Sequence, residues 1–294
     1  MKIQEGYIDF KNYKTYYRIT NPQAKKYPLL FLHGGPGSTH NYFEVFDEIA
    51  EELDRPLVMY DQIGCGKSSM DLDSSNFFNQ EFWTQELENL REKLNLENLH
   101  ILGQSWGGML ALSYCIDKKP SGLESLILSS TLSSAKLWKE EQYRRISYME
   151  REKQEIIKKA EENDDYDNPL YKEVVDEFME KYSASSPKES DPECLRRNKN
   201  AGRIAYIRAW GQNEFMPTGT LSDFDYTDKL SEIKVPSLIT SGSMDLSSPY
   251  ISKILSDNIE NSKWELFQYS RHMPFIDERK KYFKVLIAWL DNFK

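Results

Sequence analysis

A serine flanked by glycines lies where a buried strand is expected to turn directly into a helix. Residues 99–102 form a short apolar run typical of a strand, residues 103–108 read GQSWGG, and residues 109–115 read as a helix. In such a turn the backbone of Ser105 is strained, and only glycines at 103 and 107 leave room for the neighbouring elements. The turn holds the serine oxygen at the carboxyl end of a sheet, where a helix N-terminus favours negative charge. The pattern therefore predicts an α/β chain with Ser105 as a nucleophile.

Short apolar runs alternate with helical patterns along much of the chain. This alternation predicts a mostly parallel central sheet with helices on both faces. The first residues differ, because two alternating runs around Lys11 and Asn12 predict an antiparallel hairpin over residues 3–20. A helical pattern covers residues 42–53, and the runs that read as buried strands lie at 28–32, 57–60, 99–102, 126–128, 237–240 and 264–267.

One charged segment interrupts this alternation. Residues 135–224 are rich in Glu, Lys, Arg and Tyr, and lack strand-like runs. Residues 138–160 and 170–182 are expected to form amphipathic helices, and Pro187 and Pro192 mark a loop. We expect 135–224 to be a helical cap above Ser105, inserted into a core made of 1–134 and 225–294, because pockets form between such layers. The alternative is a helical subdomain with no role at the site.

Size and charge narrow the possible partners. A chain of 294 residues with 39% hydrophobic residues is long enough for one large α/β domain. Its 38 basic and 47 acidic residues give a net charge of −9. This balance argues against nucleic acid or an anionic membrane as a partner, and it is compatible with a cationic substrate.

Cysteine usage and the distribution of apolar residues predict a soluble, cytoplasmic protein. The cysteines at 65, 115 and 194 have no paired spacing and no set of histidines for zinc, so we expect reduced thiols and no metal site. Residues 1–6 lack the apolar run of a signal peptide. No stretch approaches the roughly 18 apolar residues that a membrane-spanning helix needs.

A serine nucleophile needs a base, and the order of the chain selects one of the 4 histidines. In this architecture the nucleophile comes first, then the acid, then the histidine. Only His272 follows Ser105, and it lies in the loop after the last expected strand. His100 lies inside a strand and is expected to be structural, whereas His40 has no evident partner.

The acid that orients the base is expected at the end of the strand before the last one. Asp245 follows the run at 237–240 and a glycine-containing turn, which fits this position. Asp225 and Asp228 lie in polar sequence with no strand before them. The predicted triad is Ser105, Asp245 and His272, in which Asp245 holds the imidazole tautomer and stabilises the imidazolium.

Acyl chemistry also needs hydrogen-bond donors for the oxyanion. The backbone N–H of Trp106, directly after the nucleophile, is one expected donor. The second is expected from the loop after an early strand, residues 33–37, which read HGGPG. Glycine lets a backbone N–H approach the substrate closely, and Gly35 is the predicted donor.

The GQSWGG turn, the HGGPG loop and residues 60–68, which read YDQIGCGKS, together resemble the proline iminopeptidases of the α/β-hydrolase fold, which include the tricorn-interacting aminopeptidase. The similarity runs along nearly the full chain and includes residues 211–215 and 218–225. It implies the α/β-hydrolase fold and a cofactor-free serine hydrolase. The expected activity is removal of an N-terminal proline, or another small residue, from short peptides or amino-acid amides.

In that family, acidic residues hold the free amino end of the substrate. The resemblance assigns one of these roles to Glu214, and a carboxylate in a pocket favours a substrate that carries an ammonium. A second family glutamate directly follows the triad aspartate, and this chain has Leu246 there. Leu246 is therefore a predicted substrate-binding position at which the chain departs from the family pattern.

The departure at Leu246 leaves two enzymatic hypotheses. The first is an aminopeptidase with a relaxed need for the free amine. The second is an amidase or esterase on small acyl substrates, with Leu246 lining a more apolar pocket. A non-catalytic binding protein is disfavoured because Ser105, Asp245 and His272 are all present. The sequence leaves open the preferred residue, the peptide length and the oligomeric state.

Overall fold

The apolar runs pair into one sheet in the computed structural model, which describes residues 2–68 and 78–293. Within these residues the sheet has 8 strands in the order β1-β2-β4-β3-β5-β6-β7-β8. The strands are β1 (Ile3–Phe10), β2 (Tyr13–Thr20), β3 (Leu29–Leu32), β4 (Leu57–Tyr60), β5 (Leu99–Gln104), β6 (Leu123–Ser129), β7 (Ser237–Gly242) and β8 (Ser262–Phe267).

The sheet is antiparallel at one edge and parallel elsewhere. Strands β1 and β2 form the predicted hairpin, and Lys11 in its turn has a φ of 54°. Strand β2 also pairs antiparallel with β4, whereas the pairs from β4–β3 across to β7–β8 are parallel. The predicted mostly parallel sheet is therefore confirmed.

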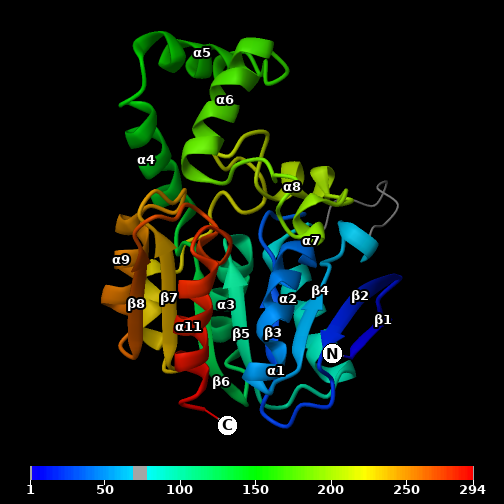
Figure 1. Ribbon diagram of the computed structural model, residues 1–294. Coiled ribbons are helices and arrows are strands. Elements are labelled where there is room, and N and C mark those ends of the chain that lie inside the picture. The colour runs from blue at the N-terminus through cyan, green and yellow to red at the C-terminus, as the bar shows by residue number, and fades with distance from the viewer. Residues whose placement is uncertain (1, 69–77, 294) are drawn as a thin grey trace.

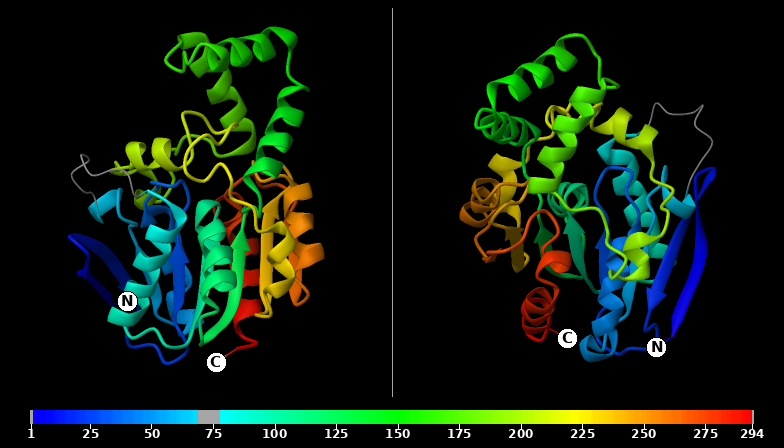
Figure 2. Two further views of the ribbon diagram at one scale, coloured as in Figure 1. Left: turned by 180° about the vertical axis from the view of Figure 1, so that it is seen from behind. Right: turned by 45° about the horizontal axis from the view of Figure 1, so that its top comes forward.

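Helices cover both faces of this sheet (Figures 1 and 2). Alternate residues of a strand point to opposite faces. Leu30 and Leu32 accordingly pack in one apolar cluster with side chains of α2, α3 and α9. Leu29 and Phe31 pack in the other cluster with side chains of η1 and α11. The two-residue period of β3 thus supplies both halves of the core.

The remaining elements connect or cover the strands. The helices near the sheet are η1 (His40–Ile49), α1 (Ala50–Leu53), η2 (Gly66–Ser68), α2 (Gln80–Lys93), α3 (Trp106–Ser113), η4 (Tyr114–Lys118), η5 (Thr227–Glu232), α9 (Pro249–Asn258), α10 (Pro274–Asp277) and α11 (Arg279–Leu290). The helices between β6 and β7 are α4 (Ala135–Ile146), α5 (Arg151–Glu162), α6 (Pro169–Tyr182), α7 (Glu193–Arg196) and α8 (Arg203–Ala209).

Helices α4, α5 and α6 stand at one end of the sheet, above the strands (Figures 1 and 2). The chain leaves the sheet after β6 to form these helices, and it returns to the sheet next to the point where it left. Ser134 and Asp225 form an isolated antiparallel bridge there, and the N–H of Ala135 donates to the carbonyl of Phe224 at 2.8 Å. The two connections to the inserted segment therefore run side by side.

Two predicted helices differ in detail. Residues 138–160 do not form one helix, because the chain breaks between α4 and α5. The Ser147 hydroxyl bonds back to the carbonyl of Arg144, and Gln154 donates to the carbonyl of Met149 at 2.7 Å, so side chains hold the break. The helix predicted at 42–53 begins as the 3₁₀ helix η1, whose period of three aligns the buried Phe43, Phe46 and Ile49.

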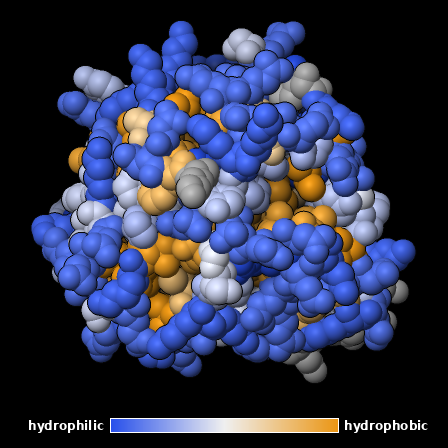
Figure 3. Space-filling model, turned by 90° about the horizontal axis from the view of Figure 1, so that it is seen from below, coloured by the Kyte–Doolittle hydropathy of each residue, from blue (hydrophilic) through white to orange (hydrophobic). Residues whose placement is uncertain are grey.

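The end of the molecule opposite α4, α5 and α6 is mostly hydrophilic, and apolar surface shows there as separate patches (Figure 3). No helix within residues 2–68 and 78–293 is long and apolar enough to span a membrane.

Candidate active site

Ser105 lies in a strained turn between β5 and α3. Its φ of 54° and ψ of −121° are unusual for a residue with a side chain. A Cβ atom at Gly103 would lie 2.3 Å from the carbonyl oxygen of Gly107, and one at Gly107 would lie 1.9 Å from that of Leu32. Both glycines are therefore required by close backbone contacts, as the sequence predicts.

Neighbouring strands hold the backbone of Ser105 in this conformation. Its N–H donates to the carbonyl of Ser129 at 3.0 Å, and its carbonyl accepts from the Thr131 hydroxyl at 2.7 Å. Both partners come from the end of β6 and the loop after it. The half-buried side chain of Ser105 is thereby held at the carboxyl ends of the parallel strands.

Asp245 and His272 are paired. The Nδ1 atom of His272 lies 2.7 Å from Oδ1 of Asp245, which is fully buried in the loop after β7. The carboxylate also accepts hydrogen bonds from the Ser130 hydroxyl at 2.6 Å and from the N–H groups of Gly242 at 3.1 Å and Ser247 at 2.8 Å. These donors fix the orientation of Asp245 toward the imidazole.

Gln104, the residue before the serine, joins the loops of the site. Its Nε2 donates to the carbonyl of His272 at 3.4 Å, and its Oε1 accepts from the Tyr42 hydroxyl at 2.9 Å. The same hydroxyl accepts from the N–H of Gly34 at 2.7 Å. The sequence pattern gave no sign of Gln104, Tyr42 or Ser130 beyond their positions close to strand ends or glycine-rich loops.

The two predicted oxyanion donors lie on either side of this turn. Trp106 begins α3, so its N–H has no partner within the helix. The HGGPG loop lies against the serine, because a Cβ atom at Gly34 would lie 3.1 Å from Cβ of Ser105. The N–H of Gly34 already donates to the Tyr42 hydroxyl. The next residue, Gly35, has a φ of 113°. The donor roles of Trp106 and Gly35 remain predictions.

Glu214 lies near the triad. The indole groups of Trp138 and Trp210 donate to its carbonyl oxygen at 2.7 and 3.3 Å, and the Tyr206 hydroxyl donates to its carboxylate at 2.7 Å. The ring centroids of Trp138 and His272 are 6.2 Å apart. Burial raises the pKa of Glu214, while the bond from Tyr206 and the nearby His272 act in the opposite direction. The inserted segment thus brings a carboxylate close to His272.

Leu246 follows Asp245 but is only 1% exposed and packs in the apolar core. Its N–H donates to the carbonyl of Tyr182 at 3.0 Å. Its own carbonyl accepts from Gln142 at 2.9 Å and from Arg145 at 3.1 Å. Its backbone therefore connects α4 and α6 to the loop after β7, and contact of its side chain with substrate remains a prediction.

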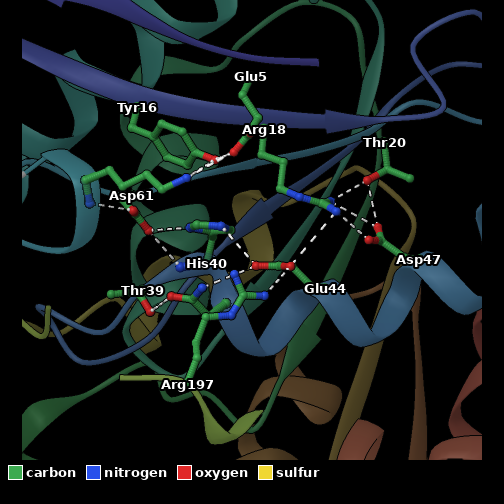
Figure 4. A network of polar contacts seen from close by, with 12 residues as sticks. Glu5, Tyr16, Arg18, Thr20, Thr39, His40, Glu44, Asp47, Asp61 and Arg197 are labelled. Atoms are coloured by element: carbon green, nitrogen blue, oxygen red, sulfur yellow. Dashed lines mark hydrogen bonds and ion pairs between the residues drawn. The ribbon is translucent and has the colours of Figure 1, made fainter. Parts of the chain in front are cut away.

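The expectation that His40 has no partner is wrong. Its Nδ1 lies 2.7 Å from Oδ1 of Asp61, and its Nε2 lies 3.3 Å from Glu44 (Figure 4). Asp61 belongs to the YDQIGCGKS box and also accepts the N–H of Lys67 at 2.8 Å. Glu44 lies four residues after His40 on the same helix, η1, whereas Asp61 lies in a separate segment. The sequence around His40 could not reveal the pairing with Asp61.

His100 is structural, as predicted. It is fully buried in β5, where its Nδ1 lies 2.8 Å from the Ser125 hydroxyl and its Nε2 lies 3.1 Å from the Arg55 guanidinium.

Comparisons with known proteins agree with this geometry. A family model described as alpha/beta hydrolase fold matches residues 27–279. A proline iminopeptidase from Clostridioides difficile (strain 630) is 57% identical over 293 residues, which is 99% of each chain. The crystal structure of VinJ has a TM-score of 0.90 and 28% identity, covering 99% of both chains. That of the Mycobacterium smegmatis proline iminopeptidase has a TM-score of 0.86 and 26% identity, covering 99% of this chain and 98% of that one.

The buried Asp245–His272 pair, which Gln104 joins to the strained turn at Ser105, and the likeness along the whole chain point to the same group of hydrolases. The chain belongs to the proline iminopeptidase family of enzymes with the α/β-hydrolase fold.

Proposed function

We propose that this protein is a serine aminopeptidase that releases N-terminal proline, or another small residue, from short peptides and amino-acid amides. The observation that carries the proposal is the Asp245–His272 pair, at 2.7 Å, close to both the Ser105 turn and the carboxylate of Glu214. Ser105, Asp245 and His272 carry out acyl transfer, and Glu214 binds the cationic amino end of the substrate. The relatives named proline iminopeptidase support the same reaction.

The reaction proceeds through an acyl-enzyme. His272 takes the proton of the Ser105 hydroxyl, and the oxygen attacks the carbonyl carbon of the first residue. The N–H groups of Gly35 and Trp106 stabilise the oxyanion. His272 then gives its proton to the leaving amine as the C–N bond breaks, and Asp245 stabilises the imidazolium. Water, activated by His272 in the same way, releases the acyl group from Ser105.

Glu214 recognises the free amino end. A carboxylate whose pKa burial raises is poorly solvated, and a substrate ammonium compensates for that loss. Tyr206 donates to the same carboxylate and orients it. An N-acylated substrate carries no such charge, so it leaves the carboxylate uncompensated.

The segment 135–224 serves as a cap over the core formed by 1–134 and 225–294, of which residues 1, 69–77 and 294 lie outside the described residues. Its paired connections at Ser134 and Asp225 support this division. So does its contribution of Trp138, Tyr206 and Glu214 to the site.

A cytoplasmic location also belongs to the proposal. Cys65, Cys115 and Cys194 are free and buried, which suits a reducing compartment.

A panel of proline anilides tests the activity. The free-amine anilide is expected to react with a higher kcat/KM than its N-acetylated form, because only the former pairs with Glu214. Glu214→Gln is the matched variant, and it should reduce this preference by about tenfold to hundredfold, since a charge-assisted hydrogen bond contributes roughly 1.5–3 kcal/mol.

A second candidate function is an amidase or esterase on small acyl substrates. The apolar, buried Leu246 favours it, because it leaves no second carboxylate directly after Asp245. Equal rates on free and blocked anilides, with faster turnover of simple esters, would support this candidate over the aminopeptidase.

A further inference from the structure

A cavity of about 390 Å³ lies beside His272. It is enclosed by η1, by the segment between α6 and α8, and by the loop that leads into α10. Residues that line it include Tyr42, Leu195, Lys199, Arg271, Met273 and Ile276. Its volume falls in the range of small-molecule sites, roughly 300–1,000 Å³.

The cavity adjoins the reacting groups through its lining. Arg271 and Met273 are the residues directly before and after His272. The N–H of His272 itself donates to the carbonyl of Ser183, at the start of the segment that encloses the cavity. Tyr42 reaches from the cavity wall to Gly34 and Gln104, next to the serine. The cavity therefore lies next to the loop that carries His272 and to the side chain of Tyr42, which contacts the residues around the serine.

Glu214 is held by a different set of residues. Trp138 belongs to α4, Tyr206 to α8, and Trp210 is the residue after α8. None of these three partners lines the cavity. The residues that recognise the amino end are thus separate from those of the cavity. A peptide bound across the serine needs one set of residues for its amino end and another for the part that follows the scissile bond.

The charged side chains of the cavity differ in how they are paired. Arg271 donates to Asp277 at 2.9 Å, to the carbonyl of Glu180 at 2.8 Å and to the Ser185 hydroxyl at 2.8 Å, so its guanidinium is engaged. Lys188 is exposed, and the bond that the Asp191 carboxylate accepts from it at 2.6 Å comes from the backbone N–H and not from the ammonium.

Lys199 differs both from Arg271, whose guanidinium is engaged, and from Lys188, which is exposed. Its side chain is partly buried, and burial lowers its pKa. Its ammonium forms no ion pair with a side chain of residues 2–68 or 78–293. A partly desolvated cation without a counter-ion gains from an anionic ligand, and it faces a cavity with an apolar wall formed by Tyr42, Leu195 and Met273.

We propose that this cavity is the subsite for the leaving part of the substrate and that Lys199 binds the terminal carboxylate of a short peptide there. The inference rests on the proposed function, because His272 must protonate the leaving amine, and the peptide that carries this amine must emerge beside His272. The apolar wall then contacts the side chain that follows the scissile bond. The substrate class is a di- or tripeptide with a free carboxyl end.

The test compares a proline dipeptide that has a free carboxylate with the same dipeptide amide, alongside the proline anilide. In Lys199→Gln, kcat/KM for the carboxylate substrate should fall about fivefold to tenfold, mostly through KM, since the interaction forms in the bound ground state. The amide and the anilide should keep their rates. Lys199→Arg should retain the preference for the carboxylate, and Lys263→Gln, which removes an exposed charge outside the cavity, should change nothing.

An equal loss on carboxylate and amide substrates in Lys199→Gln would overturn the assignment of Lys199. So would a wild-type enzyme that shows no preference for the carboxylate. Failure of the proposed function gives a different result, because the wild-type protein would then leave even the free-amine anilide intact.

Discussion

The strained backbone of Ser105 is held by contacts that are independent of the chemistry proposed for its hydroxyl. Its positive φ is held by bonds to Ser129 and Thr131 and by the close packing of Gly103 and Gly107. None of these contacts uses the serine hydroxyl. Removing that oxygen therefore removes the reacting atom and leaves the turn in place.

Ser105→Ala is expected to lower kcat for the proline anilide by at least about 10⁴-fold, because no other group replaces the acylated oxygen. Its thermal midpoint should match that of the wild-type protein. Steady-state kinetics and calorimetry of the two proteins, with exposed Ser190→Ala as control, provide the measurement. Normal turnover by Ser105→Ala would refute the acyl-enzyme mechanism.

The pair of Glu214 and Tyr206 gives a prediction about pH. The carboxylate must be ionised to hold an ammonium, so this interaction is present above the pKa of Glu214 and lost as the pH falls through it. Burial raises that pKa, and the bond from Tyr206 lowers it. Tyr206→Phe removes the bond, so the acid limb of kcat/KM for the free-amine anilide should move to higher pH.

An ester substrate without an amino group is the control for Tyr206→Phe. This substrate gives Glu214 no ammonium to hold, so the substitution should leave the acid limb of its kcat/KM unchanged. A shift of the same size with both substrates would mean that Tyr206 acts on the triad and not on amine recognition.

At the scale of elements, the contact between α3 and β3 decides whether the turn forms. A Cβ atom at Gly107 would lie 1.9 Å from the carbonyl oxygen of Leu32, which is backbone and cannot swing away. Gly107→Ala should therefore lower the free energy of unfolding by about 3 kcal/mol or more, at the upper end of overpacking effects.

Urea unfolding measures the effect of Gly107→Ala. Ser113→Ala on the same helix is the control, because it removes only a local bond to the carbonyl of Leu110 and should cost roughly 1 kcal/mol. Equal unfolding midpoints for the two variants would contradict the requirement for glycine at 107.

At the scale of the whole molecule, a buried charged network joins the sheet to the segment between α6 and α8 (Figure 4). Arg18 of β2 pairs with Asp47 at 2.6 Å, and Arg197 pairs with Glu44 of η1 at 2.6 Å. Burial opposes the charge of Glu44, but bonds from His40 and Arg197 outweigh it and lower its pKa to about 2. Burial likewise opposes the charge of His40, and its bonds to Asp61 and Glu44 raise its pKa.

These two shifts predict the pH dependence of stability. The lowered pKa of Glu44 stabilises the fold above about pH 4.5, and this contribution is lost as the pH falls toward 2. The raised pKa of His40 stabilises the fold below about pH 6.5, and this contribution is lost as the pH rises through the folded value. Both contributions are complete only between about pH 4.5 and 6.5.

Urea unfolding at pH 3, 5.5 and 8 measures these contributions. Glu44→Gln should flatten the loss of stability between pH 5.5 and 3, because the titrating carboxylate is gone. Asp257→Asn, which breaks an exposed pair with Lys253, should leave the profile as it is. An unchanged profile in Glu44→Gln would show that the network does not set the acid stability.

Local sequence patterns predicted an element well where the residues of one short segment are enough to determine its structure. The run at 57–60 is β4, and the strand ending at the GQSWGG turn extends only two residues further than predicted. The helical pattern over 138–160 failed, because its break at Ser147 depends on side-chain bonds that no apolar period reveals. Asp245 and His272 could be predicted from their order in the chain. Asp245 lies in the loop after β7, the strand before the last one, and His272 lies in the loop after the last strand, β8.

By itself, the sequence determined the sheet, the requirement for glycine around Ser105 and the paired Asp245 and His272, since steric limits and strand periodicity act over a few residues. Only the tertiary structure decided that Gln104 and Tyr42 connect the loops, that His40 is bound to Asp61, and that Leu246 is buried. It alone also brought Lys199 into one cavity with Arg271 and Met273, the two neighbours of His272 in the chain. These contacts join residues far apart in the chain, and their energies depend on burial and distance, which arise only once the core has packed.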